Sequence, residues 1–289
     1  MLWRSIAGVE RLQSRMPENG KISGQIGEPV VENLGRTGRG SVARFGWRML
    51  FLAVSLVLWE IISRTVLDPF WLSMPSLIAA RLWTLGASGD LFLHAGVTLW
   101  QAFLGLALGL PVGVGAGIVL AAYPRLAETV DPFLMGFYSL PRIALAPLFI
   151  IWFGIGLFSK VMMVFSLVVF VFILNAYQGL REVDRDLLNL MRTMRASRGY
   201  IVRKVQIPAI LPWILAALRI NVGLALVGSV LGELLGANRG LGWYVEFSGG
   251  RLDTTGVFTG LVALMVAAMI INEAVKWLER RLLPFRAGA

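Results

Sequence analysis

The side chains most able to do chemistry in this sequence are polar or charged residues set within long apolar segments. Such a group is costly to bury, so it either fixes the packing of two helices or meets a solute. Both roles are open for every residue concerned. The polar residues within or near the apolar segments are Glu60, Asn175, Arg219, Asn221, Ser229, Glu233, Asn272 and Glu273. The candidates for lining a solute path are Gln101, Asn175, Arg219, Asn221, Glu233 and Glu273.

Several kinds of chemistry are excluded by composition. Cysteine is absent and His94 is the single histidine, which excludes disulfides, thiol catalysis and histidine-rich or thiolate metal sites. The sequence has no G-x-x-x-x-G-K-[ST] phosphate loop, and Gly20-Lys21-Ile22 does not match it. We therefore expect no catalytic residue, metal or cofactor. A membrane-embedded enzyme is disfavoured, because its cluster of catalytic groups is missing.

The elements that carry the polar residues are predicted to be membrane helices. The 289 residues are 57% hydrophobic, with a mean hydropathy of +0.72. Soluble domains are nearer to half apolar, and a helix needs about 20 apolar residues to cross the hydrocarbon. The fold class expected is all-α and integral to a membrane, with six transmembrane helices. The six apolar segments are roughly Gly46–Ser63, Val97–Ala122, Phe133–Phe153, Phe158–Tyr177, Pro208–Leu235 and Val257–Trp277.

The third apolar segment is interrupted within its length. Pro141, Arg142 and Pro147 fall inside Phe133–Phe153. Proline removes a backbone donor and clashes with the preceding turn. We therefore expect a kinked or broken helix, which is tolerated only where protein covers the freed backbone groups.

Loop charge predicts the orientation of the chain. Lys and Arg concentrate in Met1–Arg48, in the loop after the fourth segment and near the C-terminus. Both termini are therefore expected in the cytoplasm. Residues 1–45 are expected to form a mobile basic cytoplasmic tail, and residues 46–286 the transmembrane domain. The net charge of +10 fits contact with anionic membrane lipid, and we expect no nucleic acid partner.

A short helix is expected between the first two spans. The stretch Asp68–Asp90 is too polar to cross the membrane. Its apolar residues follow Pro75, which suits the first turn of a helix. We expect an interfacial helix on the outer face, with apolar residues Leu77, Ile78, Leu82 and Leu85.

Four glycines recur at every fourth position of the second span. Gly105, Gly109, Gly113 and Gly117 lie on one helix face and allow close approach of another backbone. The spacing favours tight packing within one subunit. A seam between two copies, or a solute path, stays open as an alternative.

The loop Gly179–Pro208 carries a different pattern. Leu187, Leu190, Met191 and Met194 are spaced i, i+3, i+4, i+7, which predicts a short amphipathic helix. Ala196-Ser197-Arg198 provides a turn and a helix cap, and a second short helix holds Val205 before Pro208. Docking to a partner protein and lying on anionic headgroups are equally open on this periodicity.

This loop resembles the cytoplasmic coupling loop of binding-protein-dependent ABC permeases. That loop typically reads Glu-Ala-Ala, three residues, Gly, nine residues, Ile-x-Leu-Pro, and the end is matched here by Val205-Gln206-Ile207-Pro208. Asn189-Leu190-Met191 replaces Glu-Ala-Ala, and Arg195 replaces the glycine. An arginine adopts the positive φ of such a turn only at a cost.

Further stretches resemble the nitrate/sulfonate/taurine branch of these permeases, and their order and spacing together are specific. They are Leu140-Pro141-Arg142-Ile143-Ala144-Leu145-Ala146-Pro147-Leu148, Ile151-Trp152-Phe153-Gly154-Ile155-Gly156, Leu235-Gly236-Ala237-Asn238-Arg239-Gly240-Leu241-Gly242, Leu252-Asp253-Thr254 and Leu278-Glu279-Arg280-Arg281. The resemblance covers roughly residues 68–286.

The resemblance implies a type I ABC importer permease in the cell inner membrane, not an enzyme. It implies a second permease copy, an ABC ATPase subunit docked on the coupling loop, and a periplasmic substrate-binding protein. The substrate it suggests is a small anion such as a sulfonate, nitrate or taurine. The coupling residues it implies are Leu187, Leu190, Met191, Met194, Arg195, Ala196, Ser197, Arg198, Val205 and Pro208.

An ion-coupled secondary transporter is the alternative function. Such transporters often show inverted repeats and acidic residues at the bilayer midplane. No repeat is visible here, and the acidic residues sit near the ends of the spans. Whether transport needs ATP or an ion gradient separates the two.

Arg219 is expected to pair with Glu273. It lies roughly 10–16 Å beyond Pro212 or Pro208 at about 1.5 Å per residue. Counting back from Arg280 places Glu273 at a similar depth on the antiparallel sixth span. A lone charge at that depth costs about 2.5–3.5 kcal/mol on the insertion scale. We therefore predict an ion pair that joins the last two helices.

Overall fold

The computed structural model describes residues 37–68 and 70–282, and this part of the chain is helical with connecting turns. The chain divides into two units, Met1–Ser55 and Leu56–Ala289. The described part of the first unit is the N-terminal portion of helix α1, Thr37–Thr65. The predicted tail falls largely on residues 1–36, which lie outside the described residues.

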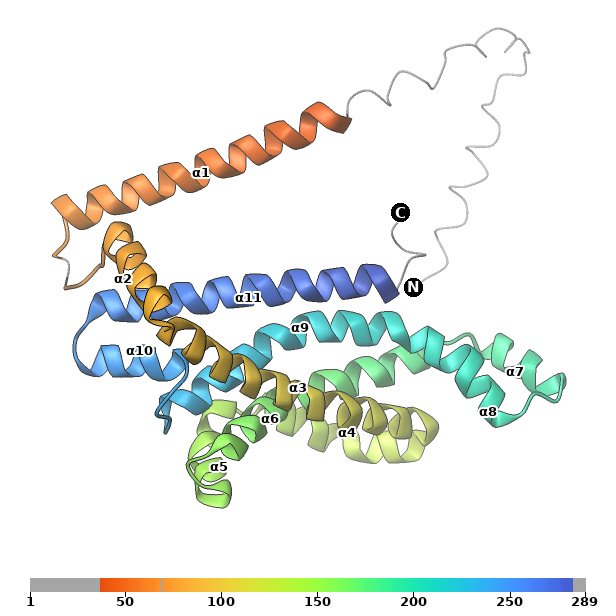
Figure 1. Ribbon diagram of the computed structural model, residues 1–289. Helices are drawn as coiled ribbons and strands as arrows, with labels where there is room; N and C mark the ends of the chain where they lie inside the picture. The colour runs from red at the N-terminus through yellow and green to blue at the C-terminus, as the bar shows by residue number, and fades with distance from the viewer. Residues whose placement is uncertain (1–36, 69, 283–289) are drawn as a thin grey trace, which may run out of the picture. The chain divides into compact units, whose positions relative to one another are not determined.

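The second unit contains the end of α1 and all later helices (Figure 1). Its helices are α2 (Pro75–Ser88), α3 (Asp90–Ala122), α4 (Pro124–Ser139), η2 (Arg142–Leu145), α5 (Ala146–Phe153), α6 (Leu157–Arg181), α7 (Arg185–Thr193), α8 (Arg198–Ile201), η3 (Val202–Gln206), α9 (Ile207–Leu234), α10 (Leu241–Gly250) and α11 (Thr254–Leu282).

The membrane fold predicted from the apolar segments is confirmed. Five helical stretches are long and apolar enough to cross a bilayer, and a sixth crossing results if α4 and α5 count as one broken span bent by 87°. The bend lies at the proline-flanked interruption, as expected. The five stretches are Gly46–Thr65, Asp90–Ala122, Leu157–Arg181, Gly199–Leu234 and Thr254–Arg281.

Several helices extend beyond the apolar segments that predicted them. The stretch that contains α9 begins at Gly199, although the apolar segment begins at Pro208. α3 begins at Asp90, and α4 begins at Pro124, before the predicted Phe133. Hydropathy finds only the part of a helix that must be apolar, so polar turns that continue the helix are missed.

The glycine stripe of α3 packs against α6. The four glycines are buried, and a β-carbon added to any of them would collide with α6. At Gly113 the collision would be with Phe172 Cβ at 2.6 Å, and at Gly117 with the carbonyl oxygen of Ile173 at 2.6 Å. The stripe therefore serves close packing within one subunit, as its spacing favoured.

The main core lies where α3, α6 and α9 meet. Val164, Val168 and Phe172 of α6 are fully buried there, together with Ala102 of α3 and Ala225 of α9. Small and β-branched residues allow three helices to approach at this contact. Figure 1 shows α6 running beside both α3 and α9.

Helices α2, α10 and α11 gather near the beginning of α3. Arg81 of α2 forms an ion pair with Asp253 at 3.1 Å, and the hydroxyls of Ser73 and Thr255 are hydrogen-bonded at 2.9 Å. The predicted helix at Pro75 is present, and Gly89 ends it with a φ of 85°. Its position at the membrane surface stays a prediction. Helix α10 was not anticipated from the sequence.

Substituting Gly113 by alanine should destabilise the protein by about 1–3 kcal/mol, because overpacking forces α3 and α6 apart. Gly115 is the matched control: it lies on the same helix, and an added β-carbon meets nothing within 4 Å. Thermal unfolding in detergent should show G113A lowered in Tm and G115A unchanged or raised. Equal effects of the two would contradict the packing role.

Candidate functional site

Two places in the described part of the chain hold most of the predicted site residues. One is the loop from α7 to η3, and the other is the polar network where α3, α6 and α9 meet α10. The loop leaves apolar side chains exposed. The network buries charged and polar side chains.

Helix α7 presents an exposed apolar stripe. Leu187, Leu190 and Met194 are 42%, 57% and 72% exposed, and Met191 on the same face is half-buried. Figure 1 shows α7 and α8 projecting beyond the ends of α6 and α9. The stripe has the i, i+3, i+4, i+7 spacing expected of a helix that rests in an apolar groove. The second unit supplies no cover for it within the described residues.

Arg195 turns the chain after α7 in a left-handed conformation. Its φ is 57°, and the N–H of Ala196 donates to the carbonyl of Met191 at 3.0 Å. This is the geometry of a helix C-terminus at which glycine is usual, because a side chain there costs about 1–2 kcal/mol. This strained turn lies at the position where the coupling loop of the resembling permeases usually has glycine.

Ser197 begins the second helix of the loop. Its hydroxyl accepts a hydrogen bond from the N–H of Tyr200 at 3.3 Å, which is the bond of a helix cap. Ala196 is half-buried, and Val205 lies in η3, which leads directly into α9 with Pro208 in its first turn. The side chain of Arg198 lies outside the described part of the chain.

Glu233 is the centre of the buried polar network. It is 1% exposed, and the N–H of Gly242 donates to its carboxylate at 2.7 Å. The Thr98 hydroxyl lies 2.9 and 3.0 Å from the two carboxylate oxygens, and it accepts from the N–H of Leu241 at 2.8 Å. These bonds join α3, the end of α9 and the start of α10, so Glu233 holds helices together.

Lys160 and Gln101 extend this network. The Lys160 ammonium, in a side chain only 5% exposed, donates to the carbonyls of Gly156 and Gly236 at 3.1 and 2.8 Å. Gln101 is 4% exposed, and its amide oxygen accepts from the hydroxyl of Ser229 at 2.9 Å. Thr98 and Lys160 were not predicted as site residues, because their partners lie far away along the chain.

The predicted pair of Arg219 and Glu273 is wrong. Arg219 forms its ion pair with Glu279, while Glu273 pairs with Lys276 at 2.6 Å. Glu279 lies six residues, about 9 Å along α11, beyond Glu273, so Arg219 lies nearer to the C-terminal end of α11 than counting from Pro208 indicated. The last two helices are joined by an ion pair with a different acid.

The two asparagines among the path candidates bond to backbone carbonyls. Asn175 donates to the carbonyl of Val171 at 2.8 Å, and Asn221 donates to that of Val168 at 3.2 Å. Asn221 is fully buried, and its amide oxygen has no hydrogen-bond partner among the described residues. Its contacts lie between α6 and α9, where it aids their packing. A path role for either residue stays a prediction.

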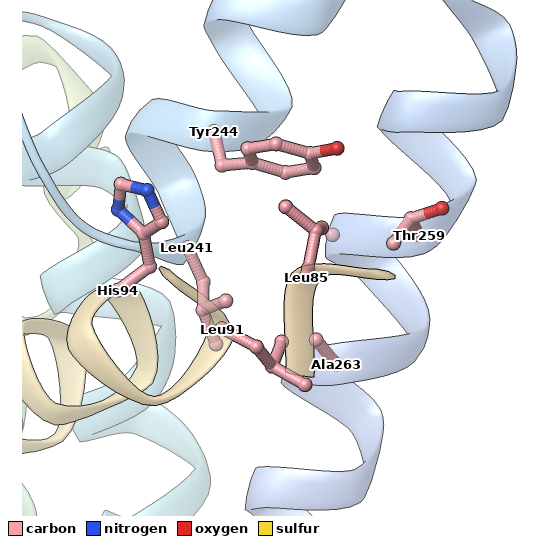
Figure 2. A pocket seen from close by; sticks show the side chains of 8 residues that line it. Leu85, Leu91, His94, Leu241, Tyr244, Thr259 and Ala263 are labelled. Carbon is pink, nitrogen blue, oxygen red and sulfur yellow. The ribbon is translucent and has the colours of Figure 1, made fainter. Parts of the chain in front are cut away.

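A small apolar pocket lies beside the network (Figure 2). Leu85, Leu91 and Leu241 line it together with His94 and Tyr244. The Nδ1 atom of His94 accepts from the N–H of Gly240 at 3.1 Å, which ties α3 to the turn before α10. The pocket walls are apolar, so they suit side-chain packing better than a polar solute.

A family comparison decides the class of the protein. The profile of the family described as "Binding-protein-dependent transport system inner membrane component" matches residues 109–284. The chain belongs to this family. It is therefore a multi-pass permease of an inner-membrane ABC transport system, as the resemblance implied.

Relatives of this permease carry names for several solutes. It is 36% identical over 82% of its length to the formylaminopyrimidine transport permease ThiX of Halalkalibacterium halodurans, with 94% of that protein covered. It is 32% identical to the putative aliphatic sulfonates permease SsuC of Bacillus subtilis, over 84% of this chain and 89% of the relative. It is 30% identical to the taurine permease TauC of Escherichia coli, over 81% and 87% of the two chains.

A solved structure agrees with the permease fold. A chain of the MetNI methionine ABC transporter, solved in inward-facing conformations, aligns with a TM-score of 0.59 and 26% identity. The alignment covers 65% of this permease and 94% of that chain. The shared architecture is that of a type I ABC importer permease.

Replacing Arg195 by glycine should stabilise the turn after α7, because the cost of a left-handed side chain disappears. Hydrogen exchange of the α7 amides should slow. The matched change R203G, in a helical conformation within η3, should speed exchange locally, since glycine weakens a helix by about 1 kcal/mol. Unchanged or faster exchange in R195G would show that the turn is not strained.

Replacing Thr98 by valine should destabilise the permease by about 1–3 kcal/mol. The change leaves the N–H of Leu241 without its acceptor and removes a donor from Glu233. T129V is the control, because the exposed Thr129 hydroxyl bonds only to the carbonyl of Arg125 in its own helix. Thermal unfolding in detergent measures both, and a T98V Tm equal to that of T129V would count against the network.

Proposed function

We propose that this permease carries a small anion across the inner membrane, driven by ATP hydrolysis in a separate ABC ATPase chain. A periplasmic binding protein delivers the solute, and two copies of the permease enclose the path. Both termini lie in the cytoplasm, on the side of the ATPase. The sulfonate and taurine relatives support an anion as substrate.

The observation that carries the ATPase partnership is the exposed apolar stripe of α7. Three apolar side chains on one face of a nine-residue helix are 42–72% exposed. Such a face buries its apolar area when it enters a groove on a partner. Arg203 and Lys204, both exposed in η3, add positive charge to the same loop.

Lipid is the competing partner for the same loop. A helix that only rests on headgroups gains from apolar contact and positive charge without regard to a groove. An ATPase groove, in contrast, is sensitive to a single charge placed in the stripe. Variants on opposite faces of α7 therefore separate the two partners.

Introducing aspartate into the stripe should release the ATPase. We predict that L187D and L190D lose at least tenfold in ATPase co-purification and in ATP-driven uptake, because a buried unpaired charge costs several kcal/mol. N189D adds the same charge on the opposite, exposed face of α7 and should retain both ATPase co-purification and uptake.

Pull-down from detergent-solubilised membranes measures association, and permease yield in the membrane fraction controls for insertion. Charge reversal in R203E tests the positive charge of η3 in the same assay. ATPase retention in L187D, L190D and R203E alike, with uptake unchanged, would refute docking through this loop. Equal losses in N189D and L190D would indicate a general charge effect at the headgroups.

A further inference from the structure

The break between α4 and α5 places irregular backbone inside a membrane span. Leu140 and Pro141 are extended, with ψ of 132° and 101°, and Arg142–Leu145 is a short 3-10 helix. The helices on either side meet at 87°. Backbone groups at such a break need partners, because hydrocarbon offers none.

Arg142 lies beside the middle of the membrane-spanning helix α6. Its guanidinium carbon is 5.1 Å from the centre of the Phe170 ring. Phe170 lies near the midpoint of α6, roughly 20 Å along the helix from Leu157 and roughly 17 Å from Arg181 at about 1.5 Å per residue. The positive charge is therefore far from both interfaces.

The break is exposed on one side of the chain. Leu140 is 39% and Ile143 55% exposed, and Pro141 and Ala144 are exposed as well. Irregular backbone at this depth is found against protein or a water-filled cavity, not against lipid. The exposed side of the break therefore faces a second permease copy or an aqueous path.

Arg142 caps the end of α4 with one of its nitrogens. Nη1 donates to the carbonyl of Tyr138 and to that of Leu140 at 3.3 Å. The guanidinium also rests on the Tyr138 ring, with its carbon 5.5 Å from the ring centre. Nη2 is buried and has no hydrogen-bond partner among the described residues. The cap therefore leaves the Nη2 group of the guanidinium without a hydrogen-bond partner in this part of the chain.

Arg142 has no acidic partner in the described part of the chain. The acids within the long apolar helices are bonded elsewhere: Glu60 to Arg64, Asp90 to Ser88, Glu233 to Thr98 and Gly242, Glu273 to Lys276, and Glu279 to Arg219. An uncompensated cation at mid-depth is costly. An anion beside the guanidinium lowers that cost.

We propose that Arg142 contacts the transported anion at mid-membrane and sets the preference of the path for negative charge. This inference rests on the proposed import of a small anion. The helix cap and the two aromatic rings hold the guanidinium in place, and its free N–H groups suit the oxygens of a sulfonate or carboxylate. Discontinuous membrane helices form solute sites at this depth in other transporters.

The absence of cysteine allows a direct test of the electric field at the break. Ala144 is replaced by cysteine, and the permease–ATPase complex in nanodiscs is labelled with the anionic reagent MTSES and the cationic reagent MTSET, with and without MgATP. Rates are divided by those for a small free thiol. The control is V266C, a 46%-exposed position near the middle of α11, which should resist both reagents.

We expect A144C to react with MTSES faster than with MTSET in at least one of the two states. The ratio of the two rates should fall by about tenfold or more in A144C/R142Q and stay high in A144C/R142K. Glutamine keeps an amide donor for the cap, so the variant tests charge. A ratio unchanged by R142Q would overturn the proposal, as would the failure of both reagents to label A144C in either state.

Uptake distinguishes this proposal from the proposed function. In proteoliposomes, R142Q should lose at least tenfold in uptake of the anion, and R142K should retain most of it. Uptake lost in R142K as fully as in R142Q would assign Arg142 to the cap alone. Wild-type complex that takes up no anion with ATP would refute the proposed function, while the labelling ratio still reports the field at Arg142.

Discussion

The close contact of α3 with α6 is the constraint on which the rest of this permease depends. Lipid tails are as apolar as leucine, so membrane helices gain little from burying apolar area against each other. Close packing and hydrogen bonds must supply the association. The four glycines of α3 provide that closeness, and β-carbons at these positions would collide with α6. Helix α9 then packs on the pair, and its end carries Glu233 into the polar network.

The same scarcity of driving force explains where the charges lie. Lys160 and Glu233 are buried, but backbone carbonyls, an N–H group and the Thr98 hydroxyl surround them. Arg219 of α9 forms an ion pair with Glu279, which lies near the C-terminal end of α11. These groups hold helices together. Arg142 differs, because its contacts with aromatic rings and carbonyl groups hold the guanidinium in place without neutralising its charge.

Local signals made much of the fold predictable from the sequence. The lengths of the apolar segments predicted the spans, and two prolines predicted the break in the third span. The spacing of the glycines predicted the packed face of α3, and the spacing of the leucines predicted the apolar face of α7. Each of these signals lies within a single helix. Helix α10 was not predicted, because a ten-residue segment ending in two glycines resembles a loop.

The polar contacts could not be derived in the same way. Thr98 and Glu233 are separated by 135 positions, and only the packed fold brings them together. Arg219 was assigned the wrong acid because counting residues from Pro208 and from Arg280 gave only an approximate depth, and the acid it meets, Glu279, lies six positions beyond Glu273. Arg142 was noted as an interruption and as part of a stretch that resembles the family, but not as a site, although a cation flanked by prolines within an apolar segment was the available signal.

ATP-dependent uptake tests the central claim most directly. The permease is reconstituted in proteoliposomes with its ATPase and binding protein, and the ligand of that binding protein, identified by screening, is supplied as the solute. Uptake should require ATP on the ATPase side and should persist when ionophores collapse all ion gradients. Uptake that proceeds on an ion gradient without ATP, and stops with ionophores, would contradict the account and favour a secondary transporter.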